Sequence, residues 1–175
     1  MRQNMEDNQL TSYQVTLIQA GVGITDGKAL WPRITDIVND SGARPLRCCS
    51  ENQAHHEADA AYLAGRPDDM IDVEIVSFGR VLGLQPVWDL VHIDIQGTEL
   101  ELCRAFVDEL SARVRYMVIG THSRKIEGDL IDLLVRARWD LEHEKPARFV
   151  FIPGETTLER MTTQDGTQVW RNPRL

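Results

Sequence analysis

The sequence predicts an α/β domain in which helices flank a mostly parallel β-sheet. Apolar, strand-like segments alternate along the chain with amphipathic stretches of helical period, which is the pattern of this fold class. One of them, VWDLVHIDI (87–95), is nearly continuous in apolar residues, as expected of a strand covered on both faces in a parallel sheet. The 175 residues fit one domain, 1–175, which is large enough for a hydrophobic core.

The first part of the chain predicts two strands joined by a turn. Residues 1–9 have the pattern of a helix end, QVTLIQA (14–20) reads as a first strand, and KALWP (28–32) follows as a short one. Between them lies GVGITDG (21–27), which follows a strand and holds glycines, as a phosphate-binding loop would. It has neither the GxGxxG nor the GxxxxGK[ST] spacing, and the Trp-Pro pair soon after it blocks an immediate helix. We therefore interpret it as a turn.

The middle of the chain combines a long irregular segment with a second strand and helix. Residues 33–69 are polar and rich in turn signals, which predicts a long excursion with one helix around 57–63. MIDVEIVSF (70–78) alternates like a half-buried strand. SFGRVLGL (77–84) leads into a short helix, and Pro86 ends the connection.

The C-terminal half begins with a helix whose start is marked by polar residues. Thr98 is expected to cap it, with Glu101 three residues on completing a capping box. Its apolar stripe consists of Leu100, Cys103, Phe106, Val107 and Leu110. The later elements are a strand at 115–120, a helix at 127–137, strands at 139–144 and 148–152, and a last short strand within 165–173.

Composition and charge limit the classes of partner. The formal net charge of −8 argues against a nucleic-acid partner, because such proteins normally carry a basic face. No apolar run approaches the ~20 residues of a membrane span, and MRQNMEDNQL at the start is no signal peptide. The three cysteines include adjacent Cys48 and Cys49, which suit neither a disulfide framework nor a zinc site. A cytoplasmic protein with reduced thiols is expected.

Polar side chains gather where two predicted strands end. Asp94 ends the strand 87–95 and is followed by Gly97 and Glu99, and the strand 115–120 runs into His122. In open α/β sheets the ligand lies beyond the carboxyl ends of the strands. If the two strands are neighbours, Asp94 and His122 face the same crevice.

Each of these residues also has a purely structural interpretation. Asp94 could order its own turn, although a carboxylate at a strand end is desolvated and needs a partner. Glu99 lies in a first helical turn, where the helix dipole favours an acid in any case. His122 could be a hydrogen-bonded loop residue. Its ordinary pKa near neutrality also suits it to accept a hydroxyl proton at physiological pH.

Four segments resemble the FkbM-type S-adenosylmethionine-dependent methyltransferases. VWDLVHIDIQGTELELCRA resembles that family's pattern D-L-[IV]-K-I-D-[VI]-E-G-[AG]-E. MVIGTHSRKIEGDLIDLL followed by RWDLEHEKP resembles its next strand, helix and strand. VTLIQAGVGITDGKALW resembles an earlier segment, and DGTQVWRNP a C-terminal one, so that the similarity covers about residues 1–173. The resemblance implies a Rossmann-like class I methyltransferase sheet and methyl transfer from S-adenosylmethionine to a hydroxyl of a sugar or another small metabolite.

The resemblance also implies roles for individual residues. Asp94 would orient the acceptor or the methionine amine of the cofactor, and His122 would accept the hydroxyl proton. Glu99 would bind acceptor hydroxyls or orient His122. Ala20 and Gly21 would lie near the adenine of S-adenosylmethionine, where small residues allow close approach. No metal site is implied.

The sequence departs from the family pattern in three residues and in one larger region. Gln96 stands where an acid is usual, His92 where a lysine is usual, and Gly120 at a position often taken by glutamate. The family's glycine-rich cofactor loop and its second strand do not precede QVTLIQA (14–20). We therefore expect a domain that lacks its first two strands, either a fragment or a natural short form, with weak or no cofactor binding alone. The exposed edge of 87–95 would then pair with 14–20 or with another chain in an oligomer.

Two other functions are considered. The chain could be a non-catalytic, methyltransferase-like interaction module. It could also be a metal-assisted sugar-transferring enzyme in which Asp94 belongs to a DxD-like pair. Gln96 at the second position argues against the latter, because a neutral amide is a poor ligand for a divalent cation.

Overall fold

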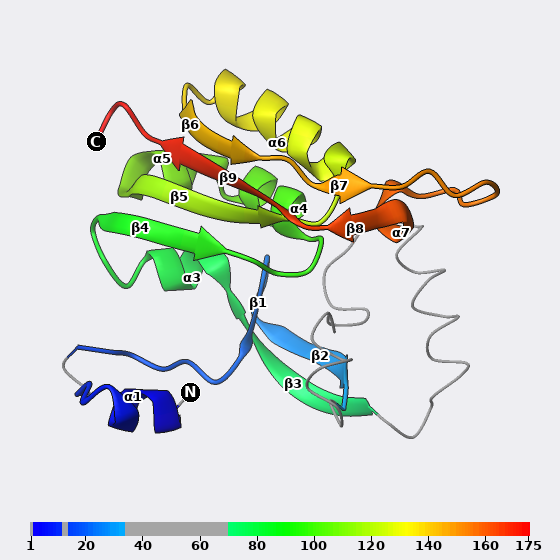
Figure 1. The fold of residues 1–175 in the computed structure, drawn as a ribbon. Helices are drawn as coiled ribbons and strands as arrows, with labels where there is room; N and C mark the ends of the chain where they lie inside the picture. Colours follow the sequence, from blue (N-terminus) through cyan, green and yellow to red (C-terminus); the bar gives the residue numbers. More distant parts are fainter. Residues whose placement is uncertain (1, 12–13, 34–69) are drawn as a thin grey trace.

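The α/β class is confirmed by the computed structural model, which describes residues 2–11, 14–33 and 70–175 (Figure 1). Its described strands form a four-stranded sheet, a three-stranded sheet and a two-stranded sheet. The helix expected around 57–63 lies outside the described residues. None of the described helices is long and apolar enough to cross a membrane.

The four-stranded sheet positions the candidate site residues. Its order is β4 (Trp88–Ile93), β5 (Val114–Thr121), β9 (Gly166–Arg171) and β6 (Asp140–Lys145). β4 runs parallel to β5, whereas β9 is antiparallel to both β5 and β6. This sheet is therefore mixed rather than mostly parallel. The parallel pair places the carboxyl ends of β4 and β5 at the same edge.

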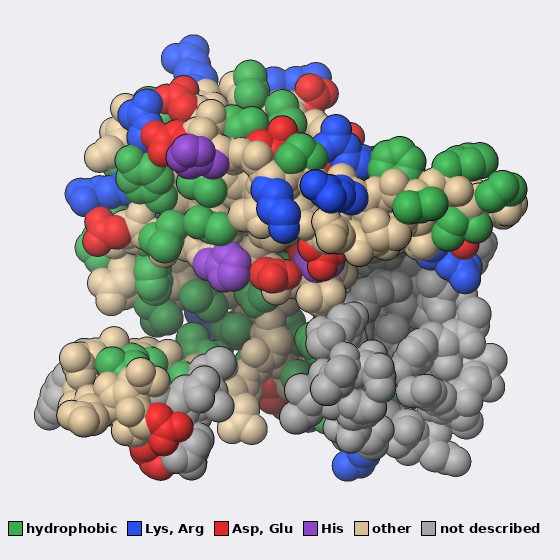
Figure 2. Space-filling model, in the orientation of Figure 1, with side chains coloured by type: hydrophobic (Ala, Val, Ile, Leu, Met, Phe, Trp, Pro, Cys, Tyr) green, Lys and Arg blue, Asp and Glu red, His purple; other side chains and the backbone are tan. Residues whose placement is uncertain are grey.

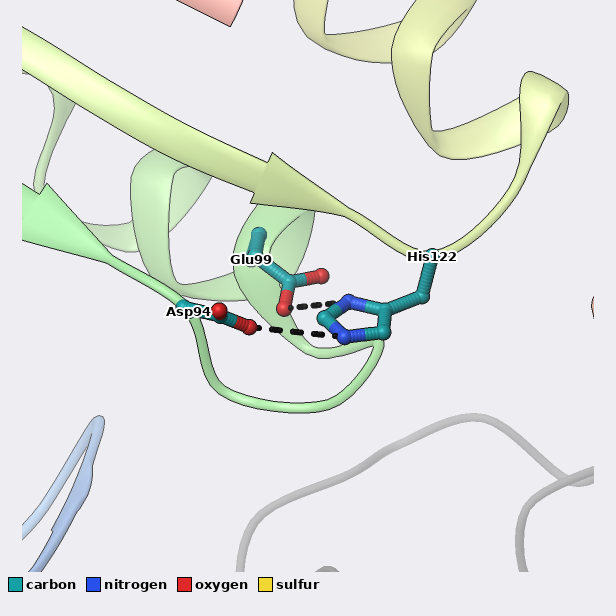
Figure 3. A group of neighbouring side chains, drawn as sticks. All are labelled: Asp94, Glu99 and His122. Atoms are coloured by element: carbon teal, nitrogen blue, oxygen red, sulfur yellow. Dashed lines mark ion pairs between the residues drawn. The ribbon is translucent and has the colours of Figure 1, made fainter. Parts of the chain in front are cut away.

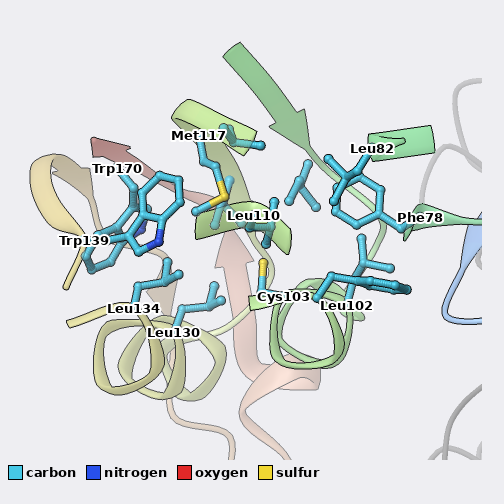
Figure 4. Close-up of a cluster of buried hydrophobic side chains, with 14 of the residues drawn as sticks. Phe78, Leu82, Leu102, Cys103, Leu110, Met117, Leu130, Leu134, Trp139 and Trp170 are labelled. Carbon is cyan, nitrogen blue, oxygen red and sulfur yellow. The ribbon is translucent and has the colours of Figure 1, made fainter. Parts of the chain in front are cut away.

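Three helices cover one face of this sheet (Figure 1). They are α4 (Glu99–Ala105), α5 (Val107–Arg113) and α6 (Arg124–Arg136), and α4 and α5 replace the single helix that the apolar stripe predicted. The core between sheet and helices includes two tryptophans and a free cysteine (Figure 4). The fully buried apolar side chains there are Cys103, Leu110, Val114, Met117, Ile119, Leu130, Leu134 and Trp170.

A buried carboxylate of α6 joins the helix to two other parts of the chain and to its own first residue. The Oε1 atom of Glu127 accepts hydrogen bonds from the Thr121 hydroxyl (2.8 Å) and from the Ala147 N–H (2.6 Å). Its Oε2 atom accepts one from Arg124 at 3.0 Å. A side chain at Gly166 on β9 would collide with Glu127 and Thr121, because the position of its Cβ is already filled. Gly166 is thus required for close packing rather than for an unusual backbone.

The three-stranded sheet comes from the N-terminal part of the chain and from the segment after residue 69. β1 (Gly21–Gly23) pairs in parallel with β3 (Met70–Ser77), and β2 (Gly27–Pro32) pairs with β3 in antiparallel fashion. The short helix α3 (Phe78–Leu82) then leads to β4. β2, β3 and α3 match the strands and the helix that the sequence predicted.

The predicted first strand, 14–20, is wrong. The structure has no strand there, and β1 begins only at Gly21, inside the predicted turn. Leu17 and Ile18 are exposed rather than packed. Gly21 allows the close contact that β1 makes with β3, because a Cβ there would lie 2.7 Å from Cδ1 of Ile75. The expectation that 14–20 pairs directly with 87–95 is also wrong, since β1 pairs with β3.

The prediction that 87–95 is covered on both faces is wrong as well. Among the described strands β4 has one neighbour, β5, and so lies at the edge of its sheet. Leu90 is 56% exposed, and its partner in register, Tyr116, is 38% exposed. Both belong to the face of the sheet that α4, α5 and α6 leave open. A run of apolar residues indicates a strand, but it does not say what covers each face.

The remaining elements lie at the ends of the chain and in a projecting arm. α1 (Arg2–Asp7) is the N-terminal helix expected from residues 1–9. In the arm, β7 (Arg148–Phe149) pairs with β8 (Thr162–Gln164), preceded by α7 (Leu158–Met161). β7 is shorter than the predicted strand 148–152. The arm carries exposed apolar side chains, which Figure 2 shows in green on the projecting part at the right: Phe149, Val150, Phe151 and Ile152.

Candidate active site at the carboxyl ends of β4 and β5

The turn after β4 is organised by a buried carboxylate. Gln96 and Gly97 both have positive φ, 58° and 95°, and this left-handed pair turns the chain sharply before α4. The turn aims the N–H groups of Ile95 and Gly97 at Oε1 of Glu99, each at 3.0 Å. Glu99 is fully buried. It therefore fixes the loop that presents Asp94.

The capping box predicted at this helix does not form. Thr98 is the N-cap residue, but its side chain makes no cap hydrogen bond. Its hydroxyl instead donates to the carbonyl oxygen of Ile95 at 3.1 Å. The carboxylate that accepts the N–H groups of Ile95 and Gly97 belongs to Glu99, because the left-handed turn brings those donors to the first helical residue.

His122 lies between two carboxylates (Figure 3). Its Nδ1 atom is 2.9 Å from Oε1 of Glu99, and its Nε2 atom is 3.4 Å from Oδ1 of Asp94. The Nδ1 contact is not aligned as a hydrogen bond in this geometry, and it becomes an ion pair when the imidazole is protonated. The side chain of His122 is 13% exposed, whereas that of Asp94 is 47% exposed. The predicted proximity of Asp94 and His122 is confirmed, and Glu99 contacts His122 as well.

The surroundings favour the protonated imidazole. The contact with Glu99 is the largest cause that raises the pKa of His122 above its usual 6.5, and burial opposes it. The charges of Glu99, Asp165 and Asp94 raise this pKa further. The sequence reasoning, which used an unperturbed histidine, missed this effect. His122 becomes a proton acceptor only at a pH above its raised pKa.

Asp165 was not identified from the sequence. It lies in the turn between β8 and β9. It acts on His122 because the antiparallel pairing of β9 with β5 places Gly166 opposite Thr121. No sequence pattern marks this proximity, since it depends on a strand pairing across more than forty residues.

The same three side chains could also surround a cation. One ligand atom each from Asp94, Glu99 and His122 lies within 4.8 Å of the others. The two ring nitrogens of His122 face different carboxylates, however, so one ion could take only one of them. Oε1 of Glu99 is already bound by two N–H groups. Either a proton or a metal ion would fit between Nε2 of His122 and Oδ1 of Asp94. Because the imidazole lies between two carboxylates, the arrangement is suited to proton transfer.

Ala20 and Gly21 are not part of this group. Gly21 begins β1 in the other sheet, and Ala20 directly precedes it. The space beside Gly21 is occupied by the side chains of Ile75 and Trp31. Among the described residues, no hydrogen bond or ion pair joins either residue to Asp94.

The sequence is similar to that of a protein described as a methyltransferase. The chain is 27% identical over 168 residues to a protein of Jannaschia sp. (strain CCS1) described as "Putative methyltransferase". The match takes in 96% of this chain but 56% of the relative, so the chain spans little more than half of that protein's length. No family model matches the sequence.

One solved structure is also similar. It is the crystal structure of a protein from Pyrococcus horikoshii described as a "putative RNA methyltransferase", with a TM-score of 0.37 and 12% sequence identity. The similarity covers 69% of this chain and 59% of that one. The sequence relative thus supports the methyltransferase resemblance and leaves the FkbM type open.

Proposed function

We propose that this chain carries the acceptor side of an S-adenosylmethionine-dependent O-methyltransferase that acts on a hydroxyl of a sugar or another small metabolite. The observation that carries the proposal is the imidazole of His122 held between Glu99 and Asp94 at the carboxyl ends of two parallel strands. The similarity of 96% of the chain to a methyltransferase supports the reaction class. The four segments that resemble FkbM-type enzymes support the acceptor class.

Each of the three side chains has a distinct task in this proposal. Glu99, buried and fixed by two backbone N–H groups, lies 2.9 Å from Nδ1 of His122 and holds the imidazole in place between the two carboxylates. Nε2, on the side of exposed Asp94, accepts the proton of the acceptor hydroxyl once His122 is neutral. Asp94 accepts a hydrogen bond from a neighbouring hydroxyl of the acceptor and thereby orients the reacting oxygen, whose own proton goes to Nε2. Bound S-adenosylmethionine would supply the electrophilic methyl group, and positioning of the two reactants would supply much of the rate.

The described residues do not fit a complete site for the cofactor. The place where a small residue was expected to admit the adenine, at Gly21, is filled by Ile75 and Trp31. Of the expected cofactor residues, Asp94 alone belongs to the carboxylate–imidazole group. We therefore expect these 175 residues to bind S-adenosylmethionine only weakly by themselves, so that transfer requires a high concentration of the cofactor.

A transfer assay tests the proposal. The chain is supplied with methyl-labelled S-adenosylmethionine at high concentration, to offset weak binding, and with a panel of monosaccharides as acceptors. Labelled product is expected, and His122→Ala should lower its rate of formation by roughly 10²–10⁴-fold. His143→Ala is the matched control, because His143 is an exposed histidine on β6 outside the site.

Two results would contradict the proposal. An unchanged rate in His122→Ala would remove this residue from the role of base. Absence of transfer to every hydroxyl acceptor, together with no heat when S-adenosylmethionine is titrated into the protein, would favour the second candidate, a non-catalytic interaction module. The filled space beside Gly21 is the observation that keeps this second candidate open.

A further inference from the structure

Gly120 lies directly beneath the carboxylate of Asp94. It is the penultimate residue of β5, two positions before His122. A Cβ at Gly120 would lie 2.9 Å from Cγ of Asp94, 3.1 Å from Oδ1 and 3.2 Å from Oδ2. All three distances are shorter than ordinary van der Waals contacts. The Asp94 carboxylate therefore fills the space that a side chain at position 120 would take.

The register of the two strands explains this contact. In the parallel pair, Ile93 on β4 is the partner of Ile119 on β5. The next residues along each strand, Asp94 and Gly120, are therefore neighbours on the same face of the sheet. The carboxylate of Asp94 leans across the bare backbone of Gly120, and this brings Oδ1 to 3.4 Å from Nε2 of His122.

The backbone at this position does not itself require glycine. Among the described glycines, positive φ occurs at Gly97 and Gly154, and Gly120 is not one of them. An alanine could therefore adopt the same backbone conformation. What it could not do is share the space with Asp94.

We propose that Gly120 is a positioning residue, whose missing side chain is the condition for the Asp94 carboxylate to reach Nε2 of His122. A larger residue at 120 moves the carboxylate away from the imidazole and opens the Asp94–His122 pair. The role of this arrangement in catalysis rests on the proposed function. From the sequence, Gly120 stood out only because the family often has glutamate at this position. In the structure, the absence of a side chain at Gly120 makes room for the carboxylate of Asp94.

A double-mutant cycle tests the proposal without an activity assay. The variants are Gly120→Ala, Asp94→Ala and the double variant, with Gly128→Ala as the control. Gly128 lies on α6 and a Cβ there meets nothing within 4 Å. The readouts are the titration of the His122 imidazole by NMR, assigned with His122→Gln, and the melting temperature. The acidic groups that act on His122 are Asp94, Glu99 and Asp165, and the cycle removes only the first.

The expected result is a dependence of the Gly120 effect on Asp94. Gly120→Ala should lower the pKa of His122 toward the value found in Asp94→Ala, and lower the melting temperature by about 2–10 °C, the range for an overpacked site in a domain of this size. Both effects of Gly120→Ala should disappear when Asp94 is already alanine. Gly128→Ala should change neither the pKa nor, except by slight stabilisation, the melting temperature.

Other outcomes overturn the proposal. An unchanged pKa in folded Gly120→Ala would show that the carboxylate does not depend on the glycine. If Gly120→Ala fails to fold, the double variant decides: folding restored by Asp94→Ala supports the collision, and continued failure refutes it. Because no variant is scored by methyl transfer, this test can fail while the proposed function holds, and the reverse is also true.

Discussion

Oε1 of Glu99 lies 2.9 Å from Nδ1 of His122 and accepts the backbone N–H groups of Ile95 and Gly97 as well. One buried oxygen thus joins the turn after β4 to the residue that follows β5. The other oxygen, Oε2, is buried without a hydrogen-bond partner among the described residues. His122 and the two N–H groups of the turn therefore compensate the burial of the Glu99 carboxylate. A substitution at position 99 should affect both the turn after β4 and His122.

Glu99→Gln should lower the pKa of His122, because the contact with Glu99 is the largest cause that raises it. The amide oxygen can still accept the N–H groups of Ile95 and Gly97, but the charge is lost. NMR titration of the His122 ring measures this directly. Glu109→Gln removes an exposed carboxylate from α5 and should leave the His122 titration unchanged. If the pKa of His122 is unaltered in Glu99→Gln, charges other than that of Glu99 stabilise the protonated imidazole.

The stability of the protein should fall as the pH rises through the raised pKa of His122. The folded pKa lies above the unfolded value near 6.5, so the stabilising contribution is fully present below pH ~6.5 and is lost above the folded pKa. Urea unfolding at a series of pH values measures the loss. It should vanish in His122→Gln and persist in His143→Gln. A rise in stability across this window that depends on His122 would reverse the assigned direction.

Transfer activity, where it is observed, should show the opposite dependence on pH. Nε2 can accept a proton only from the neutral imidazole, so the rate should increase with pH and reach its plateau above the raised pKa of His122. In Glu99→Gln the rising limb of the profile should move to lower pH. A profile that does not move would assign the titrating group to another residue.

Gly166→Ala should destabilise the protein by about 1–3 kcal/mol, as overpacking of a tight site does. Its Cβ would collide with Glu127 and Thr121 and would lie 2.6 Å from the Ala147 nitrogen. Gly27→Ala is the control, because a Cβ at Gly27 meets nothing within 4 Å. Urea unfolding compares the two. Equal effects would mean that Glu127 can move aside without loss of its hydrogen bonds.

The sequence predicted the meeting of Asp94 and His122 because only the direction of two neighbouring strands was needed. Each residue follows an apolar strand directly, and parallel neighbours end at the same edge. The strands β3, β4 and β5 and the helix α6 were predicted for a similar reason, since each has the apolar period of its own element.

The errors concern features that depend on partners distant in sequence. Apolar Leu17 and Ile18 suggested a strand, but a strand forms only where an edge is free to pair, and the edge of β3 is taken by β1 from Gly21 onwards. The exposure of Leu90 depends on what covers the second face of the sheet. The influence of Asp165 on His122 depends on the pairing of β9. None of these is encoded in local periodicity.

The burial of Cys103 makes its thiol a probe of local opening of the structure. Its thiol is fully buried on α4, and burial, with a smaller contribution from Glu99, raises its pKa to about 12. Thiolate, not thiol, attacks alkylating reagents, so the closed protein offers them neither access nor a nucleophile. Alkylation of Cys103 therefore requires α4 to move away from the sheet. The alkylation rate reports either the rate of this opening or the equilibrium population of the open form. Glu99 is the first residue of the same helix. Opening of α4 would therefore also break the contact between Glu99 and His122.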